Sequence, residues 1–301
     1  MELTVLGCHS ATPRNEAHTT SQLLVIKNHL FLIDCGEGTQ TQLRKARVKF
    51  FRIQHIFISH LHGDHFYGLI GLVSTFRLLG REKELHIYGP KGIKELITLQ
   101  LKYANSWTNY PLYFHELESK VSECIFEDDK VRVSTIPLDH RVYTNGFLFE
   151  EKPGPRHLDK AAIDALEIPF QAFEKLKQGK DYITASGEVI PNRQLTSDPN
   201  KPLRYAFCSD TAYYEPMIPI IQGVDVLYHE ATFLEQHVEL ALKTKHSTAR
   251  QAATIAQKAD VGSLILGHFS TRYADDTLFE KEAQTIFENT CIAEAGKRYR
   301  F

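Results

Sequence analysis

Six short apolar runs, each followed by polar residues, constrain the fold of this chain most strongly. The runs are rich in Val, Ile, Leu and Phe and have the length of buried strands. They lie in the segments 29–40, 55–65, 131–140, 203–211, 224–232 and 262–271. Helical patterns fall between them at 39–47, 92–104 and 248–259, and Thr248 and Gln251 have the spacing of a capping box. This alternation predicts layered β-sheets with helices packed outside.

The composition is that of a globular protein with little net charge. The 301 residues include 35 Lys and Arg against 37 Asp and Glu, which gives a net charge of −2, and 43% of the residues are hydrophobic. These values exclude a disordered tail, a collagen-like chain and a broadly basic coat for nucleic acid. A chain of this length can bury a large core.

Cysteine usage and the beginning of the chain indicate the compartment. The five cysteines are widely spread and form no CxxC pair, so neither a disulfide framework nor a thiolate zinc site is expected. The first ten residues have the pattern of a strand and a turn, and 18 apolar residues nowhere run together. We therefore expect a soluble cytoplasmic protein that does not bind membranes.

Residues 151–200 depart from the alternating pattern. The segment opens with Lys-Pro-Gly-Pro, carries a helical stretch at 158–168 and ends in a proline-containing polar loop. We predict an arm inserted into a single domain that otherwise spans residues 1–301. Lys175, Lys177 and Lys180 cluster in this arm, although a solvated charged face explains them equally well.

Four potential metal ligands lie within six residues, directly after the run Ile-Phe-Ile-Ser. They are His60, His62, Asp64 and His65, and Gly63 would permit the tight turn that their convergence needs. Four ligands this close in sequence cannot all bind one ion without strain, but alternate residues can reach two neighbouring ions. Imidazole and carboxylate without thiolate suit zinc, with manganese or iron as possible substitutes.

Three further candidates lie at predicted strand ends far along the chain: His140, Asp210 and His268. A single histidine at a strand end is usually an ordinary hydrogen-bonded residue. Together, however, the three complete a set of seven ligands, with Asp210 as the natural bridge because a carboxylate offers two oxygens. Such a two-ion site suits hydrolysis of a phosphodiester.

A leaving alkoxide also needs a proton, so an acid should lie near the ions without binding them. The candidates are His229 with Glu230, and His246. His246 precedes a predicted helix start, where free N–H groups favour a phosphate, and Glu230 could orient its ring. Alternatively, His246 is an ordinary residue before an N-cap, and Glu230 is a surface acid. Arg272 would either meet a phosphate or cap a loop.

Several motifs of the chain resemble those of a known protein family. His-Leu-His-Gly-Asp-His resembles the signature of the metallo-β-lactamase superfamily, an α/β fold built as a four-layer αββα sandwich. A narrower resemblance, to the short form of ribonuclease Z, covers essentially the whole chain. It depends on the segments 34–40, 80–93, 229–233, 246–253 and 267–273, which read DCGEGTQ, GREKELHIYGPKGI, HEATF, HSTARQAA and GHFSTRY.

The resemblance implies an endonuclease that removes the 3′ trailer from precursor tRNA after the discriminator nucleotide and leaves a 3′-hydroxyl on the tRNA. It implies two Zn²⁺ per subunit, the first held by His60, His62 and His140, the second by Asp64, His65 and His268, with Asp210 between them. It also implies that Asp64 accepts a proton from the attacking water, and that His246, assisted by Glu230, acts as the acid.

The same resemblance implies a homodimer in which the arm of one subunit grips tRNA bound to the other. Lys175, Lys177, Lys180 and Arg272 are then candidate substrate contacts. The chain departs from the family pattern at three places. Leu6-Gly7-Cys8-His9 stands where the family's opening usually reads LGTG, and Ser209 replaces a glycine that is common before the bridging aspartate. In the arm, Gln171-Ala172 replaces a Gly-Pro pair. A related phosphodiesterase for small substrates and a non-catalytic RNA-binding scaffold are the alternative functions.

Overall fold

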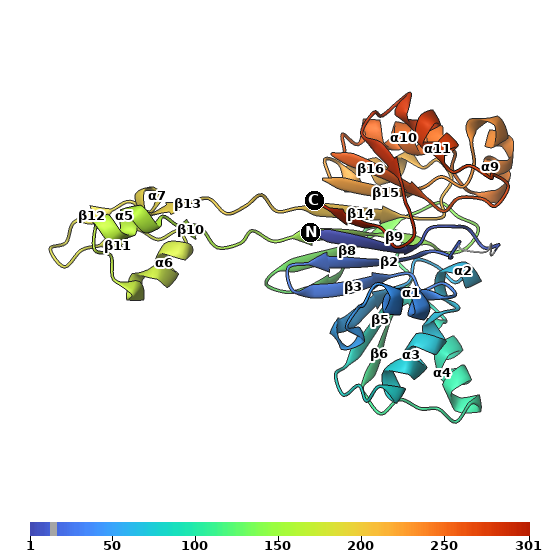
Figure 1. Ribbon diagram of the computed structural model, residues 1–301, viewed down its shortest axis with the longest axis horizontal. Helices are drawn as coiled ribbons and strands as arrows, with labels where there is room; N and C mark the ends of the chain where they lie inside the picture. The colour runs from blue at the N-terminus through green and yellow to red at the C-terminus, as the bar shows by residue number, and fades with distance from the viewer. Residues whose placement is uncertain (13–16) are drawn as a thin grey trace. The chain divides into compact units, whose positions relative to one another are not determined.

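The computed structural model describes residues 1–12 and 17–301, which form two compact units. The larger unit contains residues 1–150 and 203–301, and the smaller unit contains residues 151–202. In the larger unit, two seven-stranded sheets pack face to face, and helices cover both outer faces (Figure 1). This is the four-layer αββα sandwich that the sequence predicts.

The first sheet combines an antiparallel edge with four parallel strands. Its order is β18 (Arg298–Arg300), β1 (Glu2–Gly7), β2 (Ser21–Ile26), β3 (His29–Ile33), β4 (Ile53–Phe57), β5 (Leu85–Pro90) and β6 (Leu112–Leu117). Strands β3 to β6 run parallel to one another. The outer face is covered by α1 (Thr39–Lys45), α3 (Leu69–Leu78) and α4 (Ile93–Tyr103) (Figure 1).

The second sheet has a similar plan. Its order is β17 (Thr290–Ile292), β16 (Ser263–Gly267), β15 (Val226–Glu230), β14 (Arg204–Cys208), β9 (Asn145–Glu151), β8 (Val131–Pro137) and β7 (Cys124–Glu127). Strands β14 to β17 run parallel. The helices α8 (Ile218–Ile221), α9 (Val238–Thr244), α10 (Ala249–Lys258) and α11 (Thr277–Gln284) follow the parallel strands.

The two sheets are joined by a layer of buried aromatic side chains. The Phe31 ring lies 5.4 Å from Phe149, and the Phe57 ring lies 5.4 Å from Phe147. These four rings are fully buried and come from β3, β4 and β9. Because alternate residues of a strand face opposite sides, their neighbours in the same strands pack against the helices instead. Strands covered on both faces explain the continuous apolar runs in the sequence.

The predicted helices are present with slightly shorter bounds. Helix α10 begins after Thr248, whose side chain accepts from the Gln251 N–H while the Gln251 side chain accepts from the Thr248 N–H. This reciprocal pair is the predicted capping box, and it fixes the start of α10 directly after His246 and Ser247. None of the helices in the described part of the chain is long and apolar enough to cross a membrane.

The smaller unit has its own apolar cluster, which includes Ile163, Leu176 and Leu195. Its elements are β10 (His157–Leu158), α5 (Lys160–Ala165), α6 (Phe173–Lys177), β11 (Tyr182–Ile183), β12 (Val189–Ile190), α7 (Asn192–Leu195) and β13 (Thr196–Ser197). At the site of the missing Gly-Pro pair, a 3₁₀ turn over Phe170–Ala172 leads directly into α6. The other 3₁₀ turns among the described residues are Phe50–Arg52, Glu215–Met217 and Glu235–His237.

Candidate metal centre

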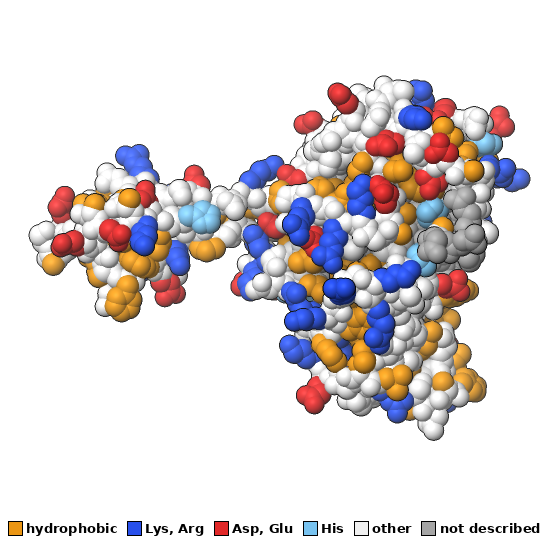
Figure 2. Space-filling model, viewed as in Figure 1, with side chains coloured by type: hydrophobic (Ala, Val, Ile, Leu, Met, Phe, Trp, Pro, Cys, Tyr) orange, Lys and Arg blue, Asp and Glu red, His pale blue; other side chains and the backbone are white. Residues whose placement is uncertain are grey.

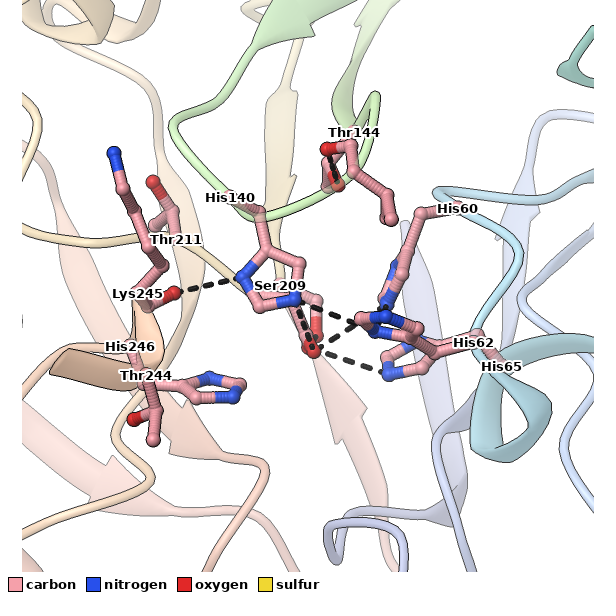
Figure 3. Close-up of polar contacts among 12 residues, drawn as sticks. His60, His62, His65, His140, Thr144, Ser209, Thr211, Thr244, Lys245 and His246 are labelled. Carbon is pink, nitrogen blue, oxygen red and sulfur yellow. Dashed lines mark hydrogen bonds and ion pairs between the residues drawn. The ribbon is translucent and has the colours of Figure 1, made fainter.

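The histidine-rich turn follows β4 and leads into α2 (Gly63–Phe66). Gly63 begins this helix and does not adopt a positive φ, so the expectation that it makes the tight turn is wrong. The change of direction takes place before it, at His62, whose backbone is extended (φ −76°, ψ 144°). As a result, His60 and His62 precede α2, whereas Asp64 and His65 belong to its single turn. Figure 3 shows the rings of His60, His62 and His65 close together.

One group of potential ligands gathers His60, His62, His140 and Asp210. The His62 Nδ1 atom lies 2.9 Å from His60 Nε2 and 3.3 Å from His140 Nε2. The Oδ2 atom of Asp210 lies 3.4 Å from His60 Nε2 and 3.8 Å from His140 Nε2. These four atoms can therefore hold one metal ion in common.

A second group gathers Asp64, His65 and His268. The Oδ2 atom of Asp64 lies 3.3 Å from Nε2 of both histidines. The Oδ1 atom of Asp210 also lies 3.2 Å from each of these two nitrogens. Asp210 thus turns one oxygen toward each group, which is the arrangement that a carboxylate shared by two ions requires.

For His65, His140 and His268, the ring nitrogen that faces away from the two groups is hydrogen-bonded. The Nδ1–H of His65 donates to Asp34 (2.7 Å), and that of His140 donates to the Lys245 carbonyl (2.8 Å; Figure 3). His268 Nδ1 lies 2.8 Å from the Thr232 hydroxyl. These bonds hold the rings in place and turn each Nε2 toward the centre, as partners of metal-binding histidines do.

Burial and charge also fit a bound cation. Burial lowers the pKa of His60, His62 and His140, which keeps their imidazoles neutral and able to bind a metal. His65 behaves differently: burial alone would lower its pKa, but the carboxylates around it, Asp210 first, raise the pKa well above its usual value. Its buried Nε2 faces Asp64 Oδ2 at 3.3 Å and Asp210 Oδ1 at 3.2 Å. These carboxylates favour positive charge at this nitrogen, where a bound metal ion would take the place of the proton.

Three residues of the centre adopt a left-handed backbone that is uncommon outside glycine. Asp34 follows β3 with φ 54°, Asp210 follows β14 with φ 47°, and His268 follows β16 with φ 62°. Each such residue costs on the order of 1–3 kcal/mol, and such strain persists where the surrounding structure holds it. At each position the chain turns sharply at the end of a strand, so that the side chain enters the centre. Ser209, the departure from the family pattern, donates to Asp210 Oδ1 at 2.9 Å.

Beside the centre, His246 and Glu230 form a buried pair. The Nδ1–H of His246 donates to Glu230 Oε1 at 2.7 Å. Burial alone would lower the pKa of His246, but the Glu230 carboxylate outweighs it and raises the pKa to about 9. Glu230 also accepts from the Thr211 N–H and from both the N–H and the hydroxyl of Thr232. His246 is therefore held protonated and oriented at neutral pH.

A cleft of about 420 Å³ connects His246 with the metal centre. His62, Asp64, Asp210, His246 and His268 all line it. The ring centroid of His246 lies 5.3 Å from that of His268 and 5.0 Å from that of His140. A substrate atom in the cleft would thus meet both potential metal ligands and a protonated imidazole.

The other predicted residues lie elsewhere. His229 is fully buried in β15 and donates to the Glu230 carbonyl, so it does not line the cleft. Arg272 is exposed, and Ser270 lines the cleft whereas Arg272 does not. Lys175, Lys177 and Lys180 are exposed on the smaller unit.

Asp34 and Thr232 also belong to the site, although neither is among the residues predicted from the sequence. Asp34 is fully buried and accepts from the Ser59 N–H and hydroxyl as well as from His65. It follows an apolar run, as the predicted ligands do, so the same criterion could have found it. Thr232 bonds to Glu230 and lies beside both His246 and His268, a role that no spacing in the sequence indicates.

Fold and site together define a metallo-β-lactamase fold with a two-part His/Asp centre. Human tRNase Z, short form, has a similar structure over the full chain (TM-score 0.73, 25% identity, 100% of this chain and 99% of that one). A metallo-β-lactamase fold protein from Bacillus subtilis, YhfI, shares the fold at 19% identity (TM-score 0.69, 99% of both chains). Residues 1–152 match the family model described as Anti-Pycsar protein Apyc1.

Curated relatives give the particular family. Ribonuclease Z of Bacteroides fragilis is 48% identical over 293 residues, which cover 97% of this chain and 96% of that protein. Ribonuclease Z of Bacteroides thetaiotaomicron is also 48% identical over 293 residues, covering 97% of this chain and 92% of that protein. This chain belongs to the ribonuclease Z family.

Proposed function

We propose that this protein is an endoribonuclease that hydrolyses precursor tRNA after the discriminator nucleotide, releases the 3′ trailer and leaves a 3′-hydroxyl on the tRNA. The observation that carries the proposal is that His246, paired with the buried Glu230, lines the same cleft as Asp64, Asp210 and His268. That combination offers a place for metal ions and an oriented acid within reach of one phosphodiester. The family of the chain supports tRNA as the substrate.

The cofactor proposed for the centre is a pair of zinc ions per subunit, for which manganese or iron could substitute. Imidazole nitrogens and carboxylate oxygens without a thiolate are a donor set that suits zinc. When bound, such a pair lowers the pKa of a water and stabilises charge on the attacking and leaving oxygens. His60, His62 and His140 would hold one ion, Asp64, His65 and His268 the other, and Asp210 would bridge them.

The remaining steps belong to side chains of this protein. Asp64 would accept a proton from the attacking water. His246 would donate its proton to the departing 3′ oxygen, and a general acid of this kind typically contributes about 10²–10⁴-fold to the rate. Glu230 would act through His246, because its carboxylate both orients the imidazole and keeps it protonated.

Local charge supports RNA binding in spite of the net charge of −2. Residues 44–52 carry five exposed cations and no acidic residue. The guanidinium of Arg298 donates to the Ala46 carbonyl at 3.1 Å, which brings the basic strand β18 beside this segment. Figure 2 shows Lys and Arg side chains gathered on the face of the larger unit where the termini lie. Affinity for nucleic acid depends on such phosphate contacts and decreases with added salt.

Further contacts with tRNA are proposed for Lys175, Lys177 and Lys180 of the smaller unit and for Arg272. A homodimer, in which the inserted unit of one subunit grips tRNA bound to its partner, is proposed from the family resemblance, and so is a cytoplasmic location. All these contacts would read RNA shape and backbone, so we expect little sequence specificity.

The test is incubation of metal-analysed protein with a precursor tRNA labelled at either end. We expect one cut after the discriminator nucleotide, a 3′-hydroxyl on the tRNA and a 5′-phosphate on the trailer, all abolished by a chelator and restored by zinc. A cut elsewhere, or a 3′-phosphate on the tRNA, would contradict the proposal.

A phosphodiesterase for small substrates is the second candidate. It is favoured by one observation: the residues of the centre, the acid pair and the cleft lining all belong to the larger unit. A small phosphodiester could therefore be cleaved without the inserted unit. Higher kcat/KM on a cyclic dinucleotide than on precursor tRNA would support this reading, and the reverse ratio would support ribonuclease activity.

A further inference from the structure

The loop between α9 and α10 contacts both parts of the proposed chemistry. The Lys245 carbonyl accepts the bond from His140 Nδ1–H at 2.8 Å, and the peptide bond that contains this carbonyl leads into His246 (Figure 3). His140 belongs to the first ligand group, and His246 is the proposed acid. A shift of this one peptide unit would therefore move a proposed metal ligand and the acid at the same time.

The backbone of Lys245 makes the turn that places this carbonyl. Lys245 ends α9 in the left-handed conformation, with φ 60° and ψ 49°. Its N–H donates to the Leu242 carbonyl at 3.3 Å, and the His246 N–H donates to the Ala241 carbonyl at 2.9 Å, which satisfies the last carbonyls of the helix. Glycine would make such a turn with less strain, so the turn alone does not account for a lysine at this position.

The side chain of Lys245 forms a second connection to the loop of His140. Its ammonium donates to both carboxylate oxygens of Asp139, at 2.7 and 2.8 Å. Asp139 directly precedes His140, so the ion pair and the carbonyl bond join the same two loops. The Asp139 backbone is braced in turn, because its N–H donates to the Thr211 hydroxyl at 3.1 Å and its carbonyl accepts from the Ala212 N–H at 2.9 Å. Since these two partners directly follow the proposed bridging aspartate, the loops of the ligand, the bridge and the acid are tied together here.

The exposure of this ion pair limits what it can contribute. The side chains of Lys245 and Asp139 are 43% and 37% exposed, and an exposed pair of this kind adds little to the stability of a fold. Neither residue is among the described residues that line the cleft. We therefore look for the effect of the pair in the placement of the two loops that it joins.

We propose that Asp139 and Lys245 are positioning residues of the reaction, whose ion pair clamps the loop of His140 to the loop of His246. The clamp fixes the separation between the first ligand group and the acid, where the ring centroids of His140 and His246 lie 5.0 Å apart. A displacement of about 1 Å in such a site costs on the order of 10²-fold in rate. This inference rests on the proposed function and adds to it two residues that act through the ligand and the acid.

Replacement of each partner tests the clamp. Lys245→Met keeps the length of the side chain and the backbone carbonyl but removes the charge, and Asp139→Asn keeps the shape of the acid. Each variant should cleave precursor tRNA with an unchanged KM and a kcat about tenfold lower, a small loss for partners of ligands because the carbonyl bond to His140 remains. The double variant should lose no more than either single variant, because both changes remove the same interaction.

A matched control is available at the other end of α10. Lys258 is an exposed lysine that also pairs with a carboxylate, that of Glu215. Lys258→Met should therefore retain the wild-type kcat and KM. All three single variants should unfold at nearly the wild-type temperature, because exposed ion pairs contribute little to stability.

Zinc binding provides a readout that does not depend on cleavage. In competition with a chelator, without RNA, Lys245→Met and Asp139→Asn should release one of two zinc ions at an affinity about tenfold lower than in the wild type, and the other ion at the wild-type affinity. Lys258→Met should release both ions as the wild type does. Failure of the wild type to cut any precursor tRNA would overturn the proposed function, whereas this measurement would still decide whether the clamp exists.

Four results would overturn the inference while the proposed function stands. The first is a wild-type kcat and zinc affinity in both variants. The second is a double variant whose loss equals the product of the two single losses. The third is a raised KM with a weaker salt dependence in Lys245→Met, which would make this lysine an RNA contact. The fourth is a loss of kcat accompanied by a clearly lower unfolding temperature, which would make the pair a support of the fold.

Discussion

Two histidine clusters lie in the larger unit, and only one of them has the geometry of a metal centre. The second, which we call the histidine ladder, consists of His55, His86 and His115 on the neighbouring strands β4, β5 and β6. The rings of His55 and His86 are 5.2 Å apart with an interplanar angle of 18°, and those of His86 and His115 are 5.2 Å apart at 20°. Rings on adjacent paired strands stack side by side. His86 Nδ1 and His115 Nε2 lie 3.0 Å apart, but the nitrogens of all three rings do not gather at one point in the described part of the chain.

The metal centre has the opposite geometry. The rings of His60 and His62 lie 4.6 Å apart at 83°, and those of His60 and His140 lie 5.3 Å apart at 69°. These histidines come from loops at the strand ends, where the backbone can turn each ring independently. Histidines on the face of a sheet share its direction, whereas histidines on converging loops can point at a common ion.

Electrostatics separates the two clusters further. In the ladder, burial and the neighbouring histidines lower the pKa of His55 to about 3. In the centre, the carboxylates around His65 raise its pKa well above the usual value in spite of complete burial. Acidic partners therefore distinguish a site that attracts cations from one that repels them.

The largest expected effect comes from the carboxylate that faces both His65 and His268. Asp64→Ala removes a proposed metal ligand and a proposed proton acceptor, so bound zinc should fall and tRNA cleavage should drop by about 10³-fold or more. Metal analysis and single-turnover cleavage measure the two losses. Asp128→Ala, which removes an acid that pairs with His29 beside the ladder, should retain both. Retention of full zinc content and cleavage in Asp64→Ala would contradict the assignment.

Loss of the proposed acid, His246, should slow cleavage without reducing metal binding. We expect His246→Ala to bind zinc normally and to cleave precursor tRNA about 10²–10⁴-fold more slowly, because the leaving oxygen has lost its proton donor. His115→Ala, in the ladder, serves as the control for a histidine outside the site. Cleavage by His246→Ala at the wild-type rate would remove this residue from the mechanism.

A substitution of Asp34 tests whether the hydrogen bond to the proposed metal ligand His65 strengthens zinc binding. Asp34→Asn keeps the shape of the side chain but loses the charge that orients His65, so zinc affinity should fall about 10–100-fold. Competition with a chelator measures the affinity, and excess zinc should restore cleavage. Asp128→Asn is the matched change beside the ladder. Equal affinity in Asp34→Asn and the wild type would show that the Asp34–His65 bond does not support the centre.

The Glu230–His246 pair predicts a shift in the pH profile. Glu230→Gln removes the charge that raises the pKa of His246, so His246 should lose its proton at lower pH. The high-pH decline of the cleavage rate should then move downward by about 1–3 pH units. Glu235→Gln, near the start of α10, is the control. A decline at the same pH in both variants and the wild type would assign it to another group.

The ladder predicts a smaller effect, confined to stability. The pKa of His55 is about 3 when folded and about 6.5 when unfolded, so its contribution is present above pH 6.5 and is lost as the pH falls toward 3. His55→Phe should therefore make the free energy of unfolding less dependent on pH in this window, by up to about 1.4 kcal/mol per pH unit. Chemical denaturation at several pH values measures this pH dependence of the free energy of unfolding, with His157→Phe as the control. An unchanged dependence would exclude the ladder as a source of acid sensitivity.

Much of the fold and of the metal centre could be predicted because both depend on local sequence patterns, namely apolar runs and the spacing of potential ligands. Apolar runs ending in His140, Asp210 and His268 indicate strands whose ends meet, and the spacing of the His60–His65 turn indicates two ions. The position of Asp34 after an apolar run could have been recognised by the same criterion, but its bond to His65, 31 residues away, could not be predicted from the sequence. The histidine ladder could not be predicted because the register that places His55 beside His86 is a property of strand pairing, not of either strand alone.

Anomalous X-ray diffraction at the zinc edge, from crystals of the zinc-loaded protein, tests the central claim most directly. We expect two peaks per chain, one on each side of Asp210, the first bounded by His60, His62 and His140 and the second by Asp64, His65 and His268. The histidine ladder should show none. A single peak, or a peak at His86 and His115 with none beside Asp210, would contradict the account.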